Sequence, residues 1–416
     1  MVIEDAICKI WEDEYEKYKD ELQKINDLST DEIFHLCKQD IIELHEQPFH
    51  TNMHTLTIME TIGCQHQIKN DKISGCSFCN WDAKRIRKIA HLASLQKQDS
   101  NKYAEAIKFS FQLIRGEQCN PNLIEQLSVH DILNEKQFPL EAYNIMFKDC
   151  GVYNRKPNIG IISARADSVT AEKIERWKAV FKRSLTVGIG IECGNEWIRN
   201  HWLNKNISNE KLIAAVECIQ DGDCKVCANI LLGLPGLSED SSLALFYDTC
   251  DYILHTLHVD YVLISPLINK NKTLGAFVDG KDSTISTKLL INAMKGLVKF
   301  FSDHLSQITF SPDNLELMKQ LKSGPELEEL LLIYEKVDNM GTVYTTVNGM
   351  HCTMLDFPWC RSISIPKTEI LKQDLLDCFS KINSKLNWNQ KNKCEEFLLE
   401  LGQLKLEELE WNRWNY

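Results

Sequence analysis

The chain has 416 residues, of which 44% are hydrophobic and 25% charged, and its 59 acidic and 47 basic residues give a formal net charge of -12. Such a composition can bury a large core and excludes a disordered protein. The negative charge repels polyanions over the surface as a whole, although it leaves room for a local basic groove.

The amino-terminal region predicts surface helices. Two acidic segments, Glu4–Ile25 and Thr30–His45, alternate apolar and charged residues, and the first lacks the basic start and apolar run of a signal peptide. The sequence contains no run of eighteen apolar residues, so it predicts no membrane-spanning helix. We therefore expect a cytoplasmic protein whose 16 cysteines stay reduced, as buried residues, metal ligands or reactive thiols.

Short β-branched segments then alternate with helical patterns. Six segments predict strands, each followed by enough chain for a crossover helix: His54–Glu60, Glu125–Asp131, Asn158–Ala164, Leu185–Glu192, Lys225–Gly233 and Tyr261–Pro266. Thr170, Ser208 and Ser238 are suitable N-caps for helices between them. This alternation predicts an α/β fold with a parallel sheet, a partial or complete barrel, and chemistry at the carboxyl ends of the strands.

Three cysteines follow the first predicted strand. Cys76 and Cys79 are separated by two residues, which lets two thiolates face one metal centre, and Cys64 precedes Cys76 by eleven residues. Structural zinc normally takes four protein ligands, whereas a four-iron cluster held by three cysteines leaves one iron open. The loop therefore predicts either a [4Fe–4S] cluster with an open iron or a zinc clip completed by His54 or His66.

Neighbouring residues would support such a centre. Phe78 would shield it from water, while Gly63 and Gly75 would let the backbone turn tightly and offer amides to the sulfides. Cys224 and Cys227 have the same two-residue spacing but enter the buried fifth strand, so we expect them to pack in the core.

The sequence predicts three domains: a helical segment over 1–50, a barrel over 51–280 and an accessory domain over 281–416. The accessory domain is mostly helical, with a hairpin that turns at Asn348-Gly349. Its cysteines are too irregularly spaced to predict an auxiliary cluster, and whether they hold one stays open: Cys352, Cys360, Cys378 and Cys394.

Over Met53–Gly280 the sequence resembles radical SAM enzymes. Besides the cysteine loop, the stretches IGIISARAD, VGIGIECGNEW and ANILLGLPGLSED match the third, fourth and fifth strands of that superfamily in the right order. The resemblance implies a partial (β/α)6 barrel of TIM-barrel type, a [4Fe–4S] cluster on the three cysteines, and bound S-adenosylmethionine. It implies cofactor contacts at Phe78, Ser163, Arg165, Glu192, Asn229, Leu232 and Gly233.

Two of these residues have chemistry that suits their implied roles. The planar guanidinium of Arg165 suits the methionyl carboxylate, and the carboxylate of Glu192, at a strand end, suits the ribose hydroxyls or the ammonium group. Either residue would serve equally in an ordinary ion pair.

The sequence also departs from the commonest family pattern. The second strand ends in LSVHDILNEKQFP, where many members have glycines and an acid, so His130, Asp131 and Asn134 are weak substitutes. Eleven residues, instead of three, separate the first two cysteines. This stretched loop resembles elongator-type enzymes and the radical SAM subunit of archaeosine synthase, which has similar counterparts to NEKQFPLEA and YVLISPLINKNKTL.

The resemblance implies reductive cleavage of S-adenosylmethionine to a 5′-deoxyadenosyl radical, which takes hydrogen from a small molecule or peptide in a biosynthetic pathway. An electron donor such as flavodoxin or ferredoxin would supply the electron. The second hypothesis is a tRNA nucleoside-modifying enzyme like the archaeosine subunit, which the net charge of -12 disfavours. The third is a non-enzymatic, zinc-stabilised barrel.

Overall fold

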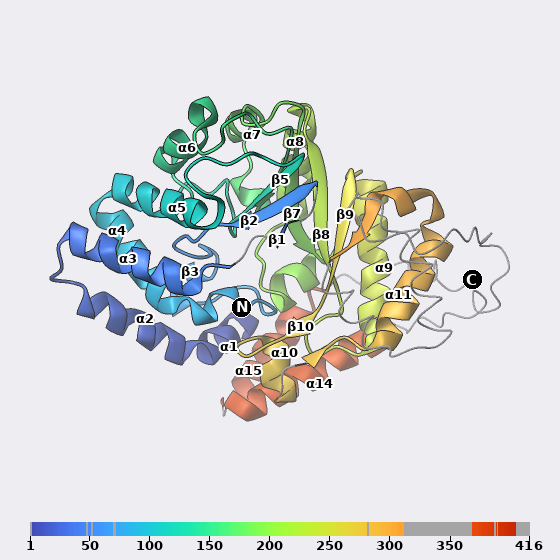
Figure 1. Cartoon of the computed structure of the whole chain (residues 1–416). Coiled ribbons are helices and arrows are strands. Elements are labelled where there is room, and N and C mark those ends of the chain that lie inside the picture. The colour runs from blue at the N-terminus through green and yellow to red at the C-terminus, as the bar shows by residue number, and fades with distance from the viewer. Residues whose placement is uncertain are drawn as a thin grey trace. The chain divides into compact units, whose positions relative to one another are not determined.

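The computed structural model (Figure 1) describes residues 2–46, 49–50, 53–69, 72–280, 283–311, 368–386, 388 and 390–404. The chain divides into two compact units. The N-terminal unit comprises residues 4–190 and 207–227, and the C-terminal unit comprises 1–3, 191–206 and 228–416. The predicted domains over 1–50, 51–280 and 281–416 stay a prediction.

The N-terminal unit is built on a mostly parallel sheet. In spatial order its strands are β1 (Phe49–His50), β2 (His54–Ile58), β5 (Ile124–Ser128), β6 (Ile159–Ala164) and β7 (Ser184–Glu192). β2, β5, β6 and β7 pair in parallel, and β1 is antiparallel to β2. The registers Ile58↔Ser128 and Ala164↔Ile189 bring the carboxyl ends of neighbouring strands to one edge. The loops that follow these strands therefore meet at that edge.

Helices connect and cover these strands. They are α1 (Val2–Ile10), α2 (Glu12–Lys24), α3 (Thr30–Leu44), α4 (Ile86–Gln98), α5 (Ser100–Arg115), α6 (Leu140–Phe147), α7 (Ala171–Lys178) and α8 (Asn209–Asp221), with 3₁₀ turns at Trp81–Lys84, Lys148–Cys150 and Ala166–Ser168. α3, α4 and α5 pack against one another beside β2. Thr170 and Ser208 cap α7 and α8 as predicted. The first predicted helix is broken in two at the buried Trp11.

The C-terminal unit continues the pattern with β8 (Lys225–Leu232), β9 (Tyr261–Pro266) and β12 (Ile308–Phe310), in that order. A small antiparallel ladder joins β10 (Ile268–Asn269) to β11 (Ser283–Thr284). All six predicted strands are present, and the predicted α/β class with a parallel, partial-barrel sheet is confirmed. β12, which pairs in parallel with β9, adds a seventh parallel strand that was not predicted, in the region expected to be a mostly helical domain with one hairpin.

The helices of this unit are α9 (Glu239–Asp251), α10 (Leu274–Asp279), α11 (Thr287–Phe300), α14 (Thr368–Leu386) and α15 (Gln390–Leu401), with π-helical turns at Ile198–Trp202 and Tyr252–Thr256 and a 3₁₀ turn at Ser302–Gln307. Ser238 caps α9 as predicted. α9 packs against α11, and α14 against α15. Glu400 of α15 accepts the Val2 amide at 3.1 Å and, through its carbonyl, the indole N–H of Trp197 at 2.7 Å.

The expected hairpin at Asn348-Gly349 lies outside the described residues, as do Cys352 and Cys360. Cys378 is buried on α14 and Cys394 is half-buried on α15. Whether these four cysteines hold an auxiliary cluster therefore stays open.

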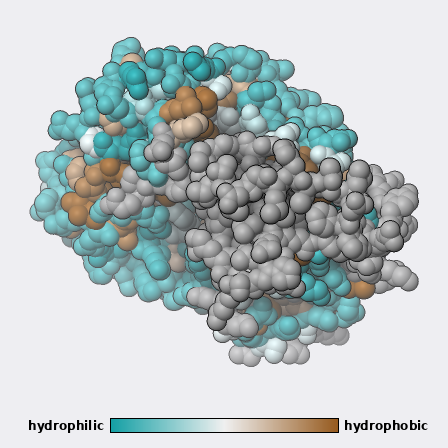
Figure 2. All heavy atoms as spheres, turned by 45° about the vertical axis from the view of Figure 1, so that its right-hand side comes forward, coloured by the Kyte–Doolittle hydropathy of each residue, from teal (hydrophilic) through white to brown (hydrophobic). Residues whose placement is uncertain are grey.

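The described surface is mainly hydrophilic in the view of Figure 2, where apolar side chains gather in separate patches. Among the large apolar side chains that are exposed are Leu398 and Leu399 on α15 and Leu140 and Ile145 on α6. Across the described ranges, no helix combines the length and apolar character needed to cross a membrane.

Two side chains of α14 bind the ends of neighbouring helices. The carboxylate of Asp374 accepts the amide N–H of Ser238 at 3.2 Å, the hydroxyl of Ser241 at 2.5 Å, and the Ser238 hydroxyl, all at the start of α9. The ammonium group of Lys385 donates to two carbonyls in the last turn of α10, at 2.6 and 2.8 Å. A negative charge at a helix N-terminus and a positive one at a C-terminus both favour the helix dipole.

We expect Asp374→Ala to lower the free energy of unfolding by about 1–2 kcal/mol, because the start of α9 loses acceptors for its N–H and hydroxyl groups. Urea unfolding followed by circular dichroism measures the change. The exposed Lys372 on the same helix provides the control, since Lys372→Ala should cost less than about 0.5 kcal/mol. Equal stability of the two variants would contradict the capping role.

Candidate cluster-binding site

A β-hairpin closes the long gap between the first two cysteines. It consists of β3 (Ile68–Lys69) and β4 (Lys72–Ile73), paired Ile68↔Ile73. The Gln67 amide donates to the Cys64 carbonyl at 2.9 Å, and the Ser74 amide donates to the Gln67 carbonyl at 2.7 Å, which extends the ladder toward both cysteines. The eleven intervening residues thus leave and return at one place, and Cys76 lies beside Cys64. This hairpin was not predicted from the sequence.

The three cysteines form one electrostatically coupled, half-buried group. Burial raises the pKa of the Cys64 thiol to about 12 and that of Cys79 further, and the neighbouring Cys76 adds to both shifts. The backbone amide of His66 hydrogen-bonds the Cys64 sulfur, and that of Trp81 hydrogen-bonds the Cys79 sulfur. These amides orient the sulfurs and favour their anionic form, so metal binding would release protons that the thiols otherwise hold.

The glycines of the loop serve the backbone in the expected way. Gly63 has a φ of 79°, and a Cβ on Gly75 would come within 3.2 Å of Gln67, so its absence lets the two arms of the hairpin approach. The Gly63 N–H donates to the Thr61 hydroxyl at 3.4 Å, and its donation to a sulfide stays a prediction. The sulfur-facing amides found here come two residues after Cys64 and Cys79.

Arg165 lies beside the cysteines. It directly follows β6, and its Nε donates to the Asp167 carboxylate at 3.2 Å. Burial alone would lower the pKa of Arg165, but Cys76, Asp167 and Cys64 together raise it. The structure thus brings one predicted cofactor residue to the thiols. Its role with a carboxylate stays a prediction.

Two other predicted residues lie in the same unit. Ser163 is half-buried as the second-to-last residue of the strand β6, where its carbonyl accepts the Ile132 amide at 3.0 Å. Phe78 lies between Cys76 and Cys79 and is half-buried. Their contacts with a cofactor stay predictions.

The two histidines proposed as zinc ligands lie in different surroundings. His54 is the first residue of β2, at the opposite end of that strand from Cys64, and its ring hydrogen-bonds Gln126 at 3.1 Å. The side chain of His66 is buried, while its amide faces the Cys64 sulfur. Among the residues that the structure describes, no three His, Cys, Asp or Glu side chains converge on one metal-ion position.

Asp82 is a component of the site that the sequence analysis missed. It belongs to the 3₁₀ turn after Cys79 and is fully buried. Its Oδ2 accepts the Cys64 amide at 2.9 Å and its Oδ1 accepts the Nε2–H of His130 at 2.9 Å. Burial opposes the charge of Asp82, but His130 and the Cys64 amide lower its pKa overall. An acid three residues after the last cysteine was the available signal.

Asp131, next to His130, is also fully buried. Its Oδ2 accepts the Ser168 hydroxyl at 2.5 Å, whereas its Oδ1 has no hydrogen-bond partner. Burial raises the pKa of Asp131 to about 6, against the opposing effect of Ser168. Whether Asp131 contacts a cofactor stays a prediction.

The remaining predicted cofactor residues belong to the C-terminal unit. Glu192 ends β7 with a φ of 66°, and its carboxylate accepts the Lys205 ammonium at 2.8 Å in a largely buried pair. Glu192 thus forms an ion pair in this structure, which was the alternative role considered for it. Asn229 is half-buried within β8, and Leu232, the last residue of β8, is fully buried.

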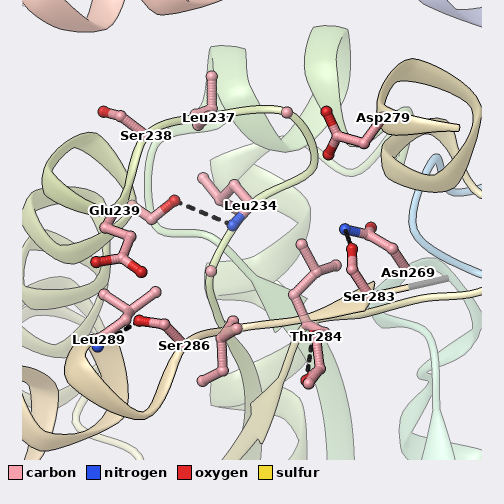
Figure 3. A pocket seen from close by; sticks show the side chains of 15 residues that line it. Leu234, Leu237, Ser238, Glu239, Asn269, Asp279, Ser283, Thr284, Ser286 and Leu289 are labelled. Carbon is pink, nitrogen blue, oxygen red and sulfur yellow. Dashed lines mark hydrogen bonds between the residues drawn. The ribbon is translucent and has the colours of Figure 1, made fainter. Parts of the chain in front are cut away.

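Gly233 lines a pocket of about 320 Å³ in the C-terminal unit (Figure 3). Its φ is 91°, a conformation that favours glycine. Figure 3 shows Leu234 in the middle of the pocket wall, with the carboxylates of Glu239 and Asp279 on different sides. Gly236 closes the loop against α14, where an added Cβ would meet the Cys378 sulfur at 2.2 Å. The loop after the fifth strand therefore borders open, polar space.

Comparisons with known proteins give limited sequence similarity. No protein-family model matches the chain. An uncharacterized protein from Methanocaldococcus jannaschii is 25% identical over 178 residues, which are 42% of this chain and 45% of that protein. The chain thus spans less than half the length of the curated relative it matches.

Several solved structures resemble the fold. The radical SAM enzyme coproporphyrinogen III oxidase from Escherichia coli has a TM-score of 0.40 at 12% identity, over 64% of this chain and 55% of that one. Elp3 from Methanocaldococcus infernus scores 0.33 at 14% identity, over 53% and 51%. The radical S-adenosylmethionine methyltransferase TsrM from Kitasatospora setae, with cobalamin and a [4Fe–4S] cluster bound, scores 0.33 at 14% identity, over 54% and 36%.

The buried Asp131 predicts a specific pH dependence of stability. Its pKa of about 6 in the folded protein exceeds the usual value near ~4. The folded state therefore holds this proton more tightly than the unfolded chain, and stability falls as pH rises from about 4 to about 6. Asp131→Asn removes this loss, so the variant should gain about 2–3 kcal/mol relative to wild type between about pH 4 and pH 7 in urea unfolding.

The matched control is Asp223→Asn, at a side chain that is 95% exposed. Its stability relative to wild type should stay constant over the same pH range. A constant difference for Asp131→Asn as well would show that Asp131 does not titrate abnormally.

Proposed function

We propose that this chain is a radical SAM enzyme. The observation that carries the proposal is the hairpin that returns Cys76 and Cys79 to Cys64 at the carboxyl end of the first parallel strand, beside Arg165. Three coupled thiols on the catalytic edge of a parallel sheet are the donor set that a [4Fe–4S] cluster with one open iron requires. The weak structural resemblances point to the same superfamily without carrying the argument.

When bound, such a cluster supplies the electron that splits S-adenosylmethionine into methionine and a 5′-deoxyadenosyl radical, which takes a hydrogen atom from the substrate. The thiolates of Cys64, Cys76 and Cys79 would hold it. The amides that face the Cys64 and Cys79 sulfurs would orient two of these ligands and stabilise their charge. Arg165 would neutralise part of the thiolate charge and bind the methionyl carboxylate.

In this proposal the other cofactor contacts come from strand ends. Glu192 would exchange its bond with Lys205 for the ammonium or ribose hydroxyls of the cofactor. Gly233, with its open backbone, would let the adenine rest against the loop after the fifth strand. Phe78, Ser163, Asn229 and Leu232 would complete the surroundings.

We further propose that the substrate is a small molecule or peptide of a biosynthetic pathway and that the enzyme works in the cytoplasm with a flavodoxin or ferredoxin. The net charge of -12 supports an uncharged or cationic substrate over a polyanion. The tRNA-modifying alternative has in its favour the sequence resemblance of the stretched loop and of NEKQFPLEA and YVLISPLINKNKTL.

The charge argument is tested by tRNA binding. We expect no retention of bulk tRNA in filter binding at physiological salt, because the surface lacks a net positive charge. Micromolar or tighter binding that weakens steeply between about 50 and 200 mM salt would favour the nucleoside-modifying alternative.

Replacing any of the three cysteines should abolish the chemistry. Protein reconstituted with iron and sulfide without oxygen should be brown and should form 5′-deoxyadenosine with dithionite and S-adenosylmethionine. Cys64→Ala, Cys76→Ala and Cys79→Ala should each reduce that product at least about 100-fold, because a ligand is lost. Visible absorbance and chromatography measure both effects.

Cys218→Ala is the control, because Cys218 is half-buried on α8, away from the loop. It should keep both colour and product. A colourless wild-type protein that contains one zinc ion and forms no 5′-deoxyadenosine would refute the proposed function and favour the zinc-stabilised barrel.

A further inference from the structure

We infer that Asp82 is a positioning residue of the cysteine site, and that together with His130 it fixes the first cysteine to the end of the second parallel strand. This inference rests on the proposed function for its link to a cluster, but its geometry stands on the described residues alone. The single carboxylate of Asp82 holds two segments at once, with the Cys64 amide and the His130 ring each 2.9 Å from one of its oxygens.

The loop is shaped to receive this carboxylate. Gly63 precedes the first cysteine, and a Cβ there would lie 2.9 Å from Asp82 Oδ2 and 2.8 Å from Ile89. A side chain at this position would therefore displace the carboxylate from the Cys64 amide. Together with its φ of 79°, this contact explains why glycine precedes the cysteine.

The element that carries Asp82 is itself held rigidly. The Asp82 carbonyl accepts the Arg85 amide at 2.9 Å, and the Arg85 guanidinium lies 3.5 Å from the Glu60 carboxylate. Lys88, one turn further on, forms a buried ion pair with Glu60, which follows β2. Asp82 is thus tied to the end of the same strand from which the cysteine loop begins.

His130 provides the second support. It follows β5, donates to Asp82, and rests edge-on against the Trp81 ring, with centroids 6.2 Å apart. In this chain the segment after the second strand lacks the glycines and acid seen in many radical SAM enzymes. The sequence alone assigns no role to its histidine. The structure gives it one: His130 orients the carboxylate that holds Cys64.

The test uses the full-length protein with Asp82→Ala and Asp82→Asn, which remove both or one of the acceptor positions, and His130→Phe, which keeps the ring but removes its N–H. In the protein before reconstitution, alkylation by iodoacetamide is followed at each cysteine by mass spectrometry. We expect the Cys64 rate to rise about tenfold in Asp82→Ala, and less in the other two variants, relative to the half-buried Cys218 of α8 in the same sample.

After reconstitution, iron and sulfide content and the electron paramagnetic resonance spectrum of the dithionite-reduced protein are measured. We expect Asp82→Ala to bind iron about 10- to 100-fold more weakly, with an altered spectrum, and Asp82→Asn to retain part of the wild-type signal. A merely structural residue would lower stability without changing the spectrum of the folded fraction.

Glu125→Gln is the matched control, because Glu125 is equally buried and paired with Arg115 at 3.0 Å, but lies at the amino-terminal part of β5. It should leave both the Cys64 rate and the spectrum unchanged. Unchanged Cys64 alkylation and full cluster loading in Asp82→Ala would overturn the inference. Wild-type protein that takes up no iron–sulfur cluster, yet shows the Cys64 effect in Asp82→Ala, would overturn the proposed function and keep the positioning role.

Discussion

The candidate site depends on the closure of one loop. Eleven residues lie between Cys64 and Cys76, and a flexible loop of that length would hold its ends together only at an entropic cost. The β3–β4 ladder removes much of that freedom, because its hydrogen bonds continue from Ile68 and Ile73 back to Gln67 and Ser74. Local backbone structure therefore brings the Cys-x-x-Cys segment back toward Cys64.

Buried charge fixes the surroundings of that loop. Glu60, Asp82 and Lys88 have almost no exposed surface, and each has an oppositely charged or hydrogen-bonding partner within the N-terminal unit. Burying any one of these charges without its partner would be costly, so the loss of one residue would destabilise the others. The price is rigidity, which suits a site that must hold ligands in one geometry.

Most of the fold could be predicted from the sequence, because the six predicted strands have five to nine residues each with alternating or continuous burial, and the predicted caps Thr170, Ser208 and Ser238 begin three of the helices. β12 could not, since three residues show no period. The β3–β4 hairpin could not be predicted either, because its strands have only two residues each. The candidate cysteine ligands could be predicted because their spacing is local, whereas the Asp82–His130 pair joins residues 48 positions apart and only the folded chain brings them together.

The hydrogen bond between the Val2 amide and Glu400 links residues 398 positions apart. During synthesis on the ribosome, Val2 is made long before α15, so this contact can form only after α15 has emerged. The N-terminal unit has no such requirement, because its segments, 4–190 and 207–227, are all translated by about the middle of the chain. The order of translation therefore lets the unit that carries Cys64, Cys76 and Cys79 assemble while the other unit is still being made.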